Sequence, residues 1–367
     1  MKHEELLNLL ALINASGIGD VMAKKLISHC GSATQVFAEK KQTLSKISGV
    51  GTAITYALND KTIFTKAEQE IDFIKTNAIQ YSYFQDDDYP VYLKHCFDAP
   101  IFFFKKGNIQ LANQKMISIV GTRQITSYGK AVLEDLIKNL AEYNPVIISG
   151  LAYGVDVLAH KLALEHNLQT VGVLAHGMDR VYPTIHKKYA DKMIDNGGLI
   201  TDYWSGTKPE RENFVKRNRI VAGLSQATIV IESADKGGSL ITADIANSYN
   251  REVFAVPGRI TDAYSRGCNQ LIKTNKAAVL TSAKDVAYIL GWEKDDKQKQ
   301  AIQQQLFIEL SETEKEVYNY LLKEGKQQLD LIALYCNLPV FKTATLLLTL
   351  ELKGVIKPLP GKIFEAI

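Results

Sequence analysis

The sequence is poor in cysteine, and its cysteines do not fall into a metal-binding or disulfide pattern. Among 367 residues there are four, Cys30, Cys96, Cys268 and Cys336, each far along the chain from the next. The seven histidines do not cluster either. A zinc site or a disulfide-stabilised scaffold is therefore excluded as the basis of the fold. We expect reduced, mostly buried thiols in a cytoplasmic protein.

Long apolar runs are also missing. The first residues, "MKHEELLNLLALINAS", interrupt their leucines with Glu4, Glu5 and Asn8. This pattern is neither a signal peptide nor an anchor, and no other segment approaches the length of a membrane span. We therefore expect no membrane partner.

An excess of charge of one sign is absent as well. The chain has 43 basic and 40 acidic residues, a formal net charge of +3. This balance does not by itself indicate a nucleic-acid partner, so any site for an anionic ligand must be built from local groups. Hydrophobic residues make up 46% of the chain, which is enough for a sizeable core.

Residues 111–290 alternate short apolar runs with segments of helical spacing. The apolar runs are "MISIV", "PVIIS", "TVGVLA", "LIT" at 199–201, "ATIVIES", "EVFAV" and "AAVL". This alternation predicts an α/β fold with a doubly wound, mainly parallel sheet. Right-handed crossovers bring the loops that follow the strands to one edge of the sheet, where open α/β sheets bind ligands.

The N-terminal region, residues 1–62, has helical periodicity and two Gly-x-Gly turns. Gly17 and Gly19 form the first turn, and Gly49 and Gly51 form the second. The pair resembles helix-hairpin-helix motifs of an all-α, SAM-like domain, in which backbone amides approach a DNA phosphate. The alternative is a bundle whose glycines only close tight corners, and we favour it for the second turn. Residues 63–110 are interpreted as a connector that enters the core, with a β-like run from residue 101 to 104.

The C-terminal region predicts a separate small domain. Residues 291–305 are polar and are interpreted as a linker, and residues 306–367 are expected to form a winged helix. Ser311 and Glu314 form a capping box, Pro339 suits the first turn of the third helix, and a Pro-Gly turn separates two short strands. The third helix carries one Lys and one Glu in an otherwise apolar or hydroxylic sequence, so we favour a protein contact or domain packing over DNA recognition.

The loops after the strands contain the candidate ligand-binding residues. The first loop, "GTRQITS", lacks the Gly-x-Gly-x-x-Gly turn of dinucleotide-binding strands and has an arginine instead. Two further loops place small residues before a predicted helix, where backbone amides and the helix dipole can attract an anion. The candidates in these three loops are Gly121, Arg123, Ser149, Gly150, Gly154, Gly237, Gly238, Ser239 and Thr242.

A basic stretch with an embedded aromatic residue follows the fourth strand. Residues 208–219, "KPERENFVKRNR", contain five basic and two acidic residues around Phe214. We take as binding candidates Arg211, Phe214, Lys216, Arg217 and Asn218. Together with the glycine loops, this stretch suits a sugar-phosphate chain with unpaired bases, because cations hold phosphates while a base stacks on the ring.

Patterns typical of catalysis are not found. There is no P-loop lysine, no carboxylate pair with an evident purpose and no Ser-His-Asp order. His160 follows Asp156 at helical spacing and could suggest a metal pair, but we favour a structural histidine and a capping role for the aspartate. Asp179 is the third polar group near the expected edge. We expect no catalytic residue, no metal and no cofactor.

Six motifs in register resemble the bacterial DprA/Smf family. They are "SIVGTRQITSYG", "ISGLAYGVDVLAH", "TVGVLAHGMDRVYP", "FVKRNRIVAGLS", "GGSLITADIA" and "VFAVPGRITDAYSRGCNQLI", preceded by the similar lead-in "YPVYLKHCFDAPIFFFKKGN". The resemblance covers about residues 85–280. Departures lie at loop edges: Ala175 replaces a common glycine, "TDYWSG" and "GGS" differ from the usual forms, and "FVKRNR" lacks a proline after Phe214.

The resemblance implies an extended Rossmann-like domain in a non-catalytic protein. This protein binds single-stranded DNA, protects it and delivers it to RecA during natural transformation and recombination. It also implies a homodimer formed through the Rossmann domain. Family DNA contacts correspond here to Arg123, to Ser149 with Gly150, and to Phe214 with Arg217 and Asn218.

Two other functions compete with this one. "GGSLITAD", with Asp244, distantly resembles the turn of Rossmann-fold hydrolases that cleave phosphoribosyl nucleotides, so a hydrolase of nucleoside monophosphates is the enzymatic alternative. A purely structural scaffold is the third possibility, and the basic strip and the glycine loops argue against it.

Overall fold

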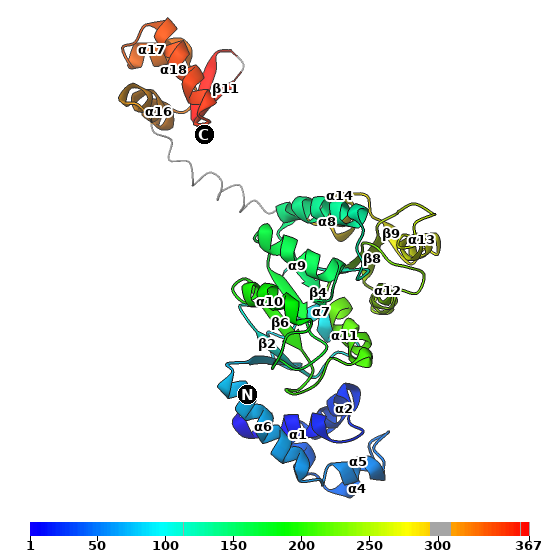
Figure 1. The fold of residues 1–367 in the computed structure, drawn as a ribbon. Coiled ribbons are helices and arrows are strands. Elements are labelled where there is room, and N and C mark those ends of the chain that lie inside the picture. Colours follow the sequence, from blue (N-terminus) through cyan, green and yellow to red (C-terminus); the bar gives the residue numbers. More distant parts are fainter. Residues whose placement is uncertain (113, 294–309, 360, 367) are drawn as a thin grey trace. The chain divides into compact units, whose positions relative to one another are not determined.

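The computed structural model describes residues 1–112, 114–293, 310–359 and 361–366 (Figure 1). The chain divides into two compact units, Met1–Asp295 and Asp296–Ile367. The expected linker at 291–305 falls mostly outside the described residues, as do residues 306–309 of the expected winged helix. No single helix among the described residues has the length and apolar character of a membrane span; Leu329–Tyr335 and Val340–Leu352 reach them only jointly, across a bend of 107°.

The first unit is built on one sheet of nine strands in the order β1-β2-β6-β5-β4-β3-β7-β8-β9. The strands from β6 to β9 in this order are parallel, and β1 and β2 add an antiparallel edge. The strands are β1 (Gln80–Tyr83), β2 (Phe102–Lys106), β3 (Met116–Val120), β4 (Val146–Ser149), β5 (Thr170–Val173), β6 (Gly197–Thr201), β7 (Ala227–Val230), β8 (Glu252–Ala255) and β9 (Ala278–Val279). The expected Rossmann-like, mainly parallel sheet is confirmed, while β1 was not anticipated.

Alternate residues of each central strand face opposite helical layers. In β3, Met116 and Val120 pack in one apolar cluster, whereas Ile117 and Ile119 pack in another. The first cluster contains α7 (Val91–Lys94), α11 (Arg211–Leu224), α12 (Gly238–Ser248) and α13 (Arg266–Lys273). The second contains α8 (Ser127–Leu140), α9 (Val155–Glu165) and α14 (Ala283–Leu290). α10 (Lys187–Met193) packs on β5, β6 and α9. Burial on both faces explains why the strands are continuous apolar runs.

The strand order reverses beside β3, and this reversal places the candidate site. β3 pairs with β4 on one side and with β7 on the other. The chain winds outward from β3 through β4, β5 and β6, then returns to β7. The loops after β3 and β7 therefore separate at a topological switch point and leave a crevice at the carboxyl ends of the strands.

The N-terminal helices pack with the antiparallel edge of the sheet. They are α1 (His3–Asn14), α2 (Asp20–Cys30), α3 (Ala33–Ala38), α4 (Lys41–Leu44), α5 (Thr52–Ala57) and α6 (Thr62–Thr76). The two Gly-x-Gly turns join α1 to α2 and α4 to α5, as expected. The segment interpreted as a connector begins with the long helix α6, which packs on α1 and buries Ile63, Ala67, Ile71 and Ile74. These helices share one apolar cluster with β1 and β2.

The second unit has the order helix, strand, helix, helix, hairpin. Its elements are α16 (Glu312–Glu324), β10 (Gln327–Gln328), α17 (Leu329–Tyr335), α18 (Val340–Leu352), β11 (Ile356–Leu359) and β12 (Ile363–Ala366). The capping box of Ser311 and Glu314 is present, and Pro339 directly precedes α18. This order is the one that a winged helix has, and the winged-helix assignment remains an interpretation of it.

Candidate nucleic-acid interface

A hollow of about 630 Å³ opens at the switch point, between the loops after β3 and β7 and the helices α11 and α12. Ten of the fourteen candidate residues line it: Gly121, Arg123, Arg211, Phe214, Arg217, Asn218, Gly237, Gly238, Ser239 and Thr242. Ser149, Gly150, Gly154 and Lys216 are not among its lining residues. Three of the four segments predicted to meet at one edge of the sheet therefore bring candidate residues to one cavity, and the loop after β4 does not.

Arg123 lies over the ring of Phe214 at the border of this hollow. The guanidinium carbon of Arg123 lies 5.5 Å from the centre of the Phe214 ring. Arg123 is exposed on the loop after β3, and Phe214 is half-buried on the first turns of α11. The ring of Tyr182 lies 6.1 Å from that of Phe214. A planar cation and aromatic faces at one opening can hold a phosphate and a base at the same time.

The loop after β4 uses its polar groups internally, contrary to the expectation that its amides would meet an anion. Ser149 is fully buried, and its hydroxyl donates to the carbonyl of Ile119 at 2.6 Å. Burial raises the pKa of Asp156, and the nearby Arg217 together with hydrogen bonds from the amides of Ala152 and Gly150 opposes the increase. The amides of this loop therefore donate to the buried carboxylate of Asp156. This arrangement agrees with the capping role that we favoured for Asp156.

Arg217 is a buried positioning group rather than an open cation. It is 4% exposed, and its guanidinium donates to the carbonyls of Gly150, at 2.8 Å, and of Val173. A side chain at Gly150 would collide with this guanidinium, which explains the glycine there. Burial lowers the pKa of Arg217, while Asp156 acts in the opposite direction. Arg217 therefore lines the hollow with a guanidinium that already donates to two carbonyls, and its predicted contact with DNA stays a prediction.

Gly154 packs directly against the backbone of the Arg123 loop. Its φ of +75° is unfavourable for other residues, and a Cβ there would collide with the carbonyl oxygen of Thr122. The amide of Val155 donates to that same oxygen at 3.1 Å. Gly154 borders a neighbouring hollow of about 250 Å³ that Lys130 and Lys161 also line. Gly154 therefore contributes to the main hollow indirectly, because it helps to position Arg123.

The Gly-Gly loop after β7 opens the helix α12 toward the hollow. Gly238 is exposed at the first position of α12, and the amides of a first helical turn have no acceptor within their helix. Ser239 and Thr242 are mostly buried, and the hydroxyl of Ser239 donates to that of Ser233 at 2.9 Å. The two hydroxyls therefore line the hollow, and the exposed Gly238 places the start of α12 beside them.

Lys236 and Glu232 contribute to the site but were not selected from the sequence. Lys236 lines the hollow and is exposed beside the Gly-Gly turn, and its place directly before that turn was a readable signal. Glu232 is 3% exposed, and its carboxylate accepts hydrogen bonds from the amide, at 2.9 Å, and the hydroxyl of Thr126. Thr126 caps α8, so Glu232 fastens the end of the Arg123 loop to β7. No sequence pattern marked this acid.

The groups considered for catalysis are engaged elsewhere. His160 is fully buried, its Nδ1 lies 2.7 Å from the Thr170 hydroxyl, and burial lowers its pKa to about 3. Asp179 accepts from Arg180 and from the amide of Gly206. Asp244 pairs with Lys276 at 2.9 Å and does not line the hollow. Among the residues that the structure describes, no group of three or more His, Cys, Asp or Glu side chains could hold a metal.

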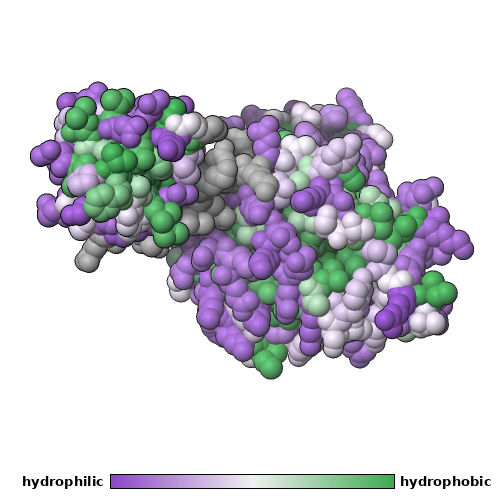
Figure 2. Space-filling view, turned by 90° about the horizontal axis from the view of Figure 1, so that it is seen from above, coloured by the Kyte–Doolittle hydropathy of each residue, from purple (hydrophilic) through white to green (hydrophobic). Residues whose placement is uncertain are grey.

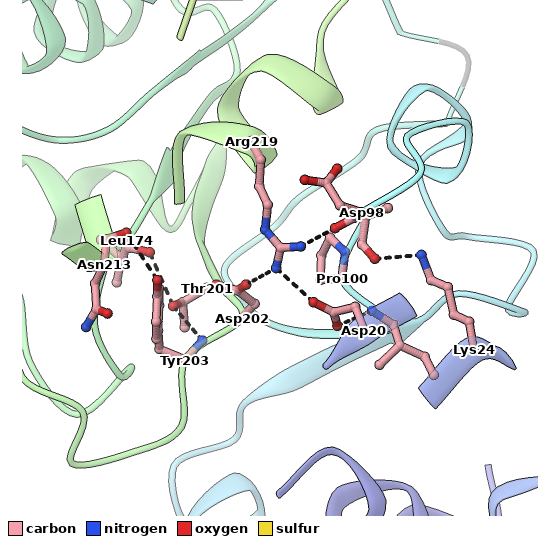
Figure 3. Close-up of polar contacts among 12 residues, drawn as sticks. Asp20, Lys24, Asp98, Pro100, Leu174, Thr201, Asp202, Tyr203, Asn213 and Arg219 are labelled. Atoms are coloured by element: carbon pink, nitrogen blue, oxygen red, sulfur yellow. Dashed lines mark hydrogen bonds and ion pairs between the residues drawn. The ribbon is translucent and has the colours of Figure 1, made fainter. Parts of the chain in front are cut away.

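The first Gly-x-Gly turn of the N-terminal helices directs its polar groups to the core (Figure 3). Asp20, on the first turn of α2, accepts from the amide of Ile101 at 2.9 Å and from Arg219 of α11 at 3.0 Å. Arg219 also donates to Asp202 at 2.6 Å, and Lys24 donates to the carbonyl of Ala99. An acid at this helix start, already paired, opposes the phosphate-binding interpretation of the turn.

The same contacts fasten α11, which carries Phe214. Arg219 holds the second half of the helix, and the hydroxyl of Tyr203 donates to the carbonyl of Asn213 at 3.1 Å near its start (Figure 3). Burial lowers the pKa of Arg219, but the charges of Asp202 and Asp20 raise it by more. The net change is an increase, so the guanidinium stays charged. The N-terminal helices thus help to fix the helix that borders the hollow.

Comparison with known proteins gives concordant similarities. Residues 80–291 match the model of the family DNA recombination-mediator protein A. The chain is 41% identical to the DNA processing protein DprA of Bacillus subtilis over 199 residues, which are 54% of this chain and 67% of that protein. It is similar to the X-ray structure of DNA processing protein A from Streptococcus pneumoniae, with a TM-score of 0.64, 30% identity and coverage of 80% of this chain and 99% of that one. It is also similar to DNA processing protein A from Helicobacter pylori, described for its single-stranded DNA binding mode, with a TM-score of 0.53, 28% identity and coverage of 58% and 98%.

Proposed function

Because this chain belongs to the DNA recombination-mediator protein A family, we propose that it binds single-stranded DNA in the hollow at the switch point of its sheet. The observation that carries the proposal is the position of Arg123 over Phe214 at 5.5 Å, at the mouth of that hollow. The relative from Helicobacter pylori, whose structure concerns its single-stranded DNA binding mode, supports the same ligand class.

The composition of the hollow suits an unpaired strand. Arg123, Arg211 and Lys236 are exposed cations at its border and can neutralise phosphates. Phe214 offers a ring on which any base can stack, which gives affinity without reading the sequence. A mononucleotide would occupy the floor and leave part of this border unused. The test is a titration of labelled single-stranded and double-stranded DNA at two salt concentrations, and equal affinity for both forms would contradict the proposal.

The finer role is delivery of the bound strand to RecA, with protection of incoming DNA during natural transformation, by a homodimer formed through the Rossmann domain. The name of the family, a recombination mediator, supports this role. We expect the protein to shorten the delay before RecA hydrolyses ATP on DNA coated by a single-strand-binding protein. A delay unchanged by saturating protein would contradict the delivery role and leave strand binding as the function.

We assign no catalytic step to the hollow. Among the described residues that line it, Asp156 is the one carboxylate, and it is buried under amide hydrogen bonds. The alternative, hydrolysis of nucleoside monophosphates, would need an acid facing the ligand, and Asp244 pairs with Lys276 instead. Incubation with each nucleoside monophosphate should release no base, and a free base detected by chromatography would favour the hydrolase.

Phe214 provides the first test of how the strand is held. Phe214→Ala should weaken binding of single-stranded DNA by about 1–3 kcal/mol, because one base loses its stacking partner. Phe214→Tyr should keep most of the affinity. Fluorescence anisotropy with a labelled oligothymidine measures both.

Phe97→Ala serves as the matched control, since Phe97 is 73% exposed and lies outside the hollow. If Phe214→Ala binds as tightly as the Phe97 variant, Phe214 only packs the helix and the stacking role is wrong.

A further inference from the structure

A second cavity lies beside the loop that carries Arg123 and is not part of the site at the switch point. This cavity, the lysine hollow, has a volume of about 250 Å³. Its walls come from the Arg123 loop, from the loop after β4 and from the helices α8, α9 and α10. The lining residues are Ile125, Lys130, Gly154, Val157, Leu158, Lys161 and Tyr189.

The lysine hollow and the main hollow share their boundary. Thr122 and Arg123 line the main hollow, whereas Ile125, further along the same loop, lines the lysine hollow. In the loop after β4, Ala152 lines the main hollow and Gly154 lines the lysine hollow. A Cβ at Gly154 would collide with the backbone of Thr122 and Arg123, so the two loops are in direct contact. A strand held at Arg123 therefore has to cross only these packed loops to reach the lysine hollow.

The charge of the lysine hollow suits a phosphate. Lys130 of α8 and Lys161 of α9 are both exposed, and none of the described residues that line the cavity is an acid. Lys161 pairs with Glu165 at 3.6 Å, but both side chains are about half exposed, and such surface pairs contribute little stability. A phosphate can therefore replace this pairing at little cost. Two cations from two helices at one opening attract an anionic chain.

The rest of the lining suits the sugar and the base of a nucleotide. Ile125, Val157 and Leu158 are half-buried apolar groups, and the half-buried ring of Tyr189 lies beside them in the lining. The ammonium group of Lys188 lies 5.0 Å from the centre of that ring. Apolar and aromatic surface accepts any base without reading its sequence. The lysine hollow thus combines cations with a ring as the main hollow does, whereas a free inorganic anion would use the cations alone.

Another cavity near the start of α8 is a poorer continuation for the strand. It has a volume of about 580 Å³ and is lined by Tyr128, Pro257, Gly258, Arg259 and Asp262, so its one cation is accompanied by an acid. Figure 2 shows hydrophilic side chains over much of the visible face of the first unit, the larger body. A single exposed lysine is therefore ordinary on this surface. Two lysines at a cavity without an acid, next to the Arg123 loop, are a more specific arrangement.

We propose that the lysine hollow is a second nucleotide-binding site, which holds the part of the same single strand that extends from the main hollow across the Arg123 loop. This inference rests on the proposed function, because the strand reaches the lysine hollow from Arg123. Lys130 and Lys161 hold phosphates there, and the apolar lining contacts the sugar and the base. The binding surface for the strand is thereby longer than the main hollow alone.

The first test is the dependence of affinity on strand length in the full chain. Oligothymidines of increasing length, from the dinucleotide upward, compete with a labelled strand for Lys130→Ala and for the unmodified protein at 0.15 M salt. The shortest oligonucleotides fill only the main hollow, so their affinity should not change. Beyond a threshold length, Lys130→Ala should weaken binding by about two- to fivefold and lower the slope of log affinity against log salt by about 0.7. Lys161→Ala should have the same threshold.

Lys138→Ala is the matched control, because Lys138 is exposed on the same helix about 12 Å further along its axis, where its field is screened at this salt concentration. A loss in the Lys130 variant that is equal at all lengths, or no larger than that of the Lys138 variant, would overturn the proposal. Binding of the shortest oligonucleotides and its sensitivity to Arg123→Ala test the proposed function separately. The second site can therefore fail while the main hollow still binds the strand.

The second test detects the contact in the unmodified protein. Lysines are acetylated with and without saturating oligothymidine, and the modified positions are quantified by mass spectrometry. A long strand should protect Lys130 and Lys161 at least threefold, a strand below the threshold length should not, and Lys138 should react equally in all samples. Full reactivity of Lys130 under a saturating long strand would overturn the proposal. Equal protection by inorganic phosphate would also overturn it, since the cavity would then be a site for a small anion.

Discussion

Arg123→Ala should weaken binding of oligothymidine and of mixed-sequence single-stranded DNA by a similar factor, between about ten and a hundred. A hydrogen bond to a charged group is worth roughly 1.5–3 kcal/mol, and Arg123 is the exposed cation that lies over Phe214. The effect should not depend on sequence, because a guanidinium at the mouth of the hollow holds the phosphate backbone. The slope of log affinity against log salt should also decrease by about 0.7, the value for one phosphate contact on a single strand.

Lys138→Ala is the control for net charge. Lys138 is an exposed cation of α8 far from the Thr126 end that borders the Arg123 loop. It should change neither the affinity nor the salt slope appreciably. A loss confined to one DNA sequence would contradict backbone binding, and an unchanged salt slope in the Arg123 variant would show that the arginine makes no phosphate contact.

The sheet could be predicted from the sequence because its strands are buried on both faces. A run such as Met116–Val120 has no polar side, and runs of this kind alternated with helical segments at regular intervals. β1 was not predicted, because it is short and carries Gln80 and Ser82 among its tyrosines. α6 was not predicted for a different reason. Its buried residues Ile63, Ala67, Ile71 and Ile74 do follow helical spacing, but their burial depends on contact with α1, which lies far away in the sequence.

The candidate site could be located but not resolved residue by residue. A basic stretch does not reveal which of its cations faces the ligand, and only the helical period of α11 separates them. Arg211, Phe214 and Asn218 lie three or four positions apart and share the face that lines the hollow, whereas Lys216 does not line it. Arg217 also lines it, but its guanidinium is held by the carbonyls of Gly150, after β4, and Val173, in β5. Such partners are fixed by tertiary structure and leave no pattern in the local sequence.

Arg217→Met should be the most destabilising single change at the site. Asp156 and Arg217 are both buried, and removal of the arginine leaves the carboxylate without its nearby positive charge. Removing one partner of a buried charge pair typically costs about 3–5 kcal/mol of the free energy of unfolding. Urea denaturation at neutral pH, followed by circular dichroism, measures this loss.

The loss should depend on pH in a defined direction. Burial already raises the pKa of Asp156 above its ordinary value of 3.8, and the loss of Arg217 should raise it further. A carboxyl whose pKa is higher in the folded state binds its proton more tightly there, so it stabilises the fold most when protonated. That stability is lost as the pH rises through the folded-state pKa. The Arg217→Met variant should therefore be destabilised more at neutral pH than at mildly acidic pH, relative to the unmodified chain.

Asp156→Asn in the same background is the decisive control. It removes the buried charge, so the double variant should regain part of the lost stability at neutral pH and lose the pH dependence. Asp156→Asn alone leaves Arg217 buried beside a neutral group, and it should be destabilising without a comparable dependence on pH in this range. If the double variant is no more stable than Arg217→Met at neutral pH, the arginine acts through its hydrogen bonds to Gly150 and Val173 rather than through its charge. Since Gly150 directly follows β4 and Val173 is the last residue of β5, the loss would then reflect packing at the ends of these strands and not the electrostatics of the buried pair.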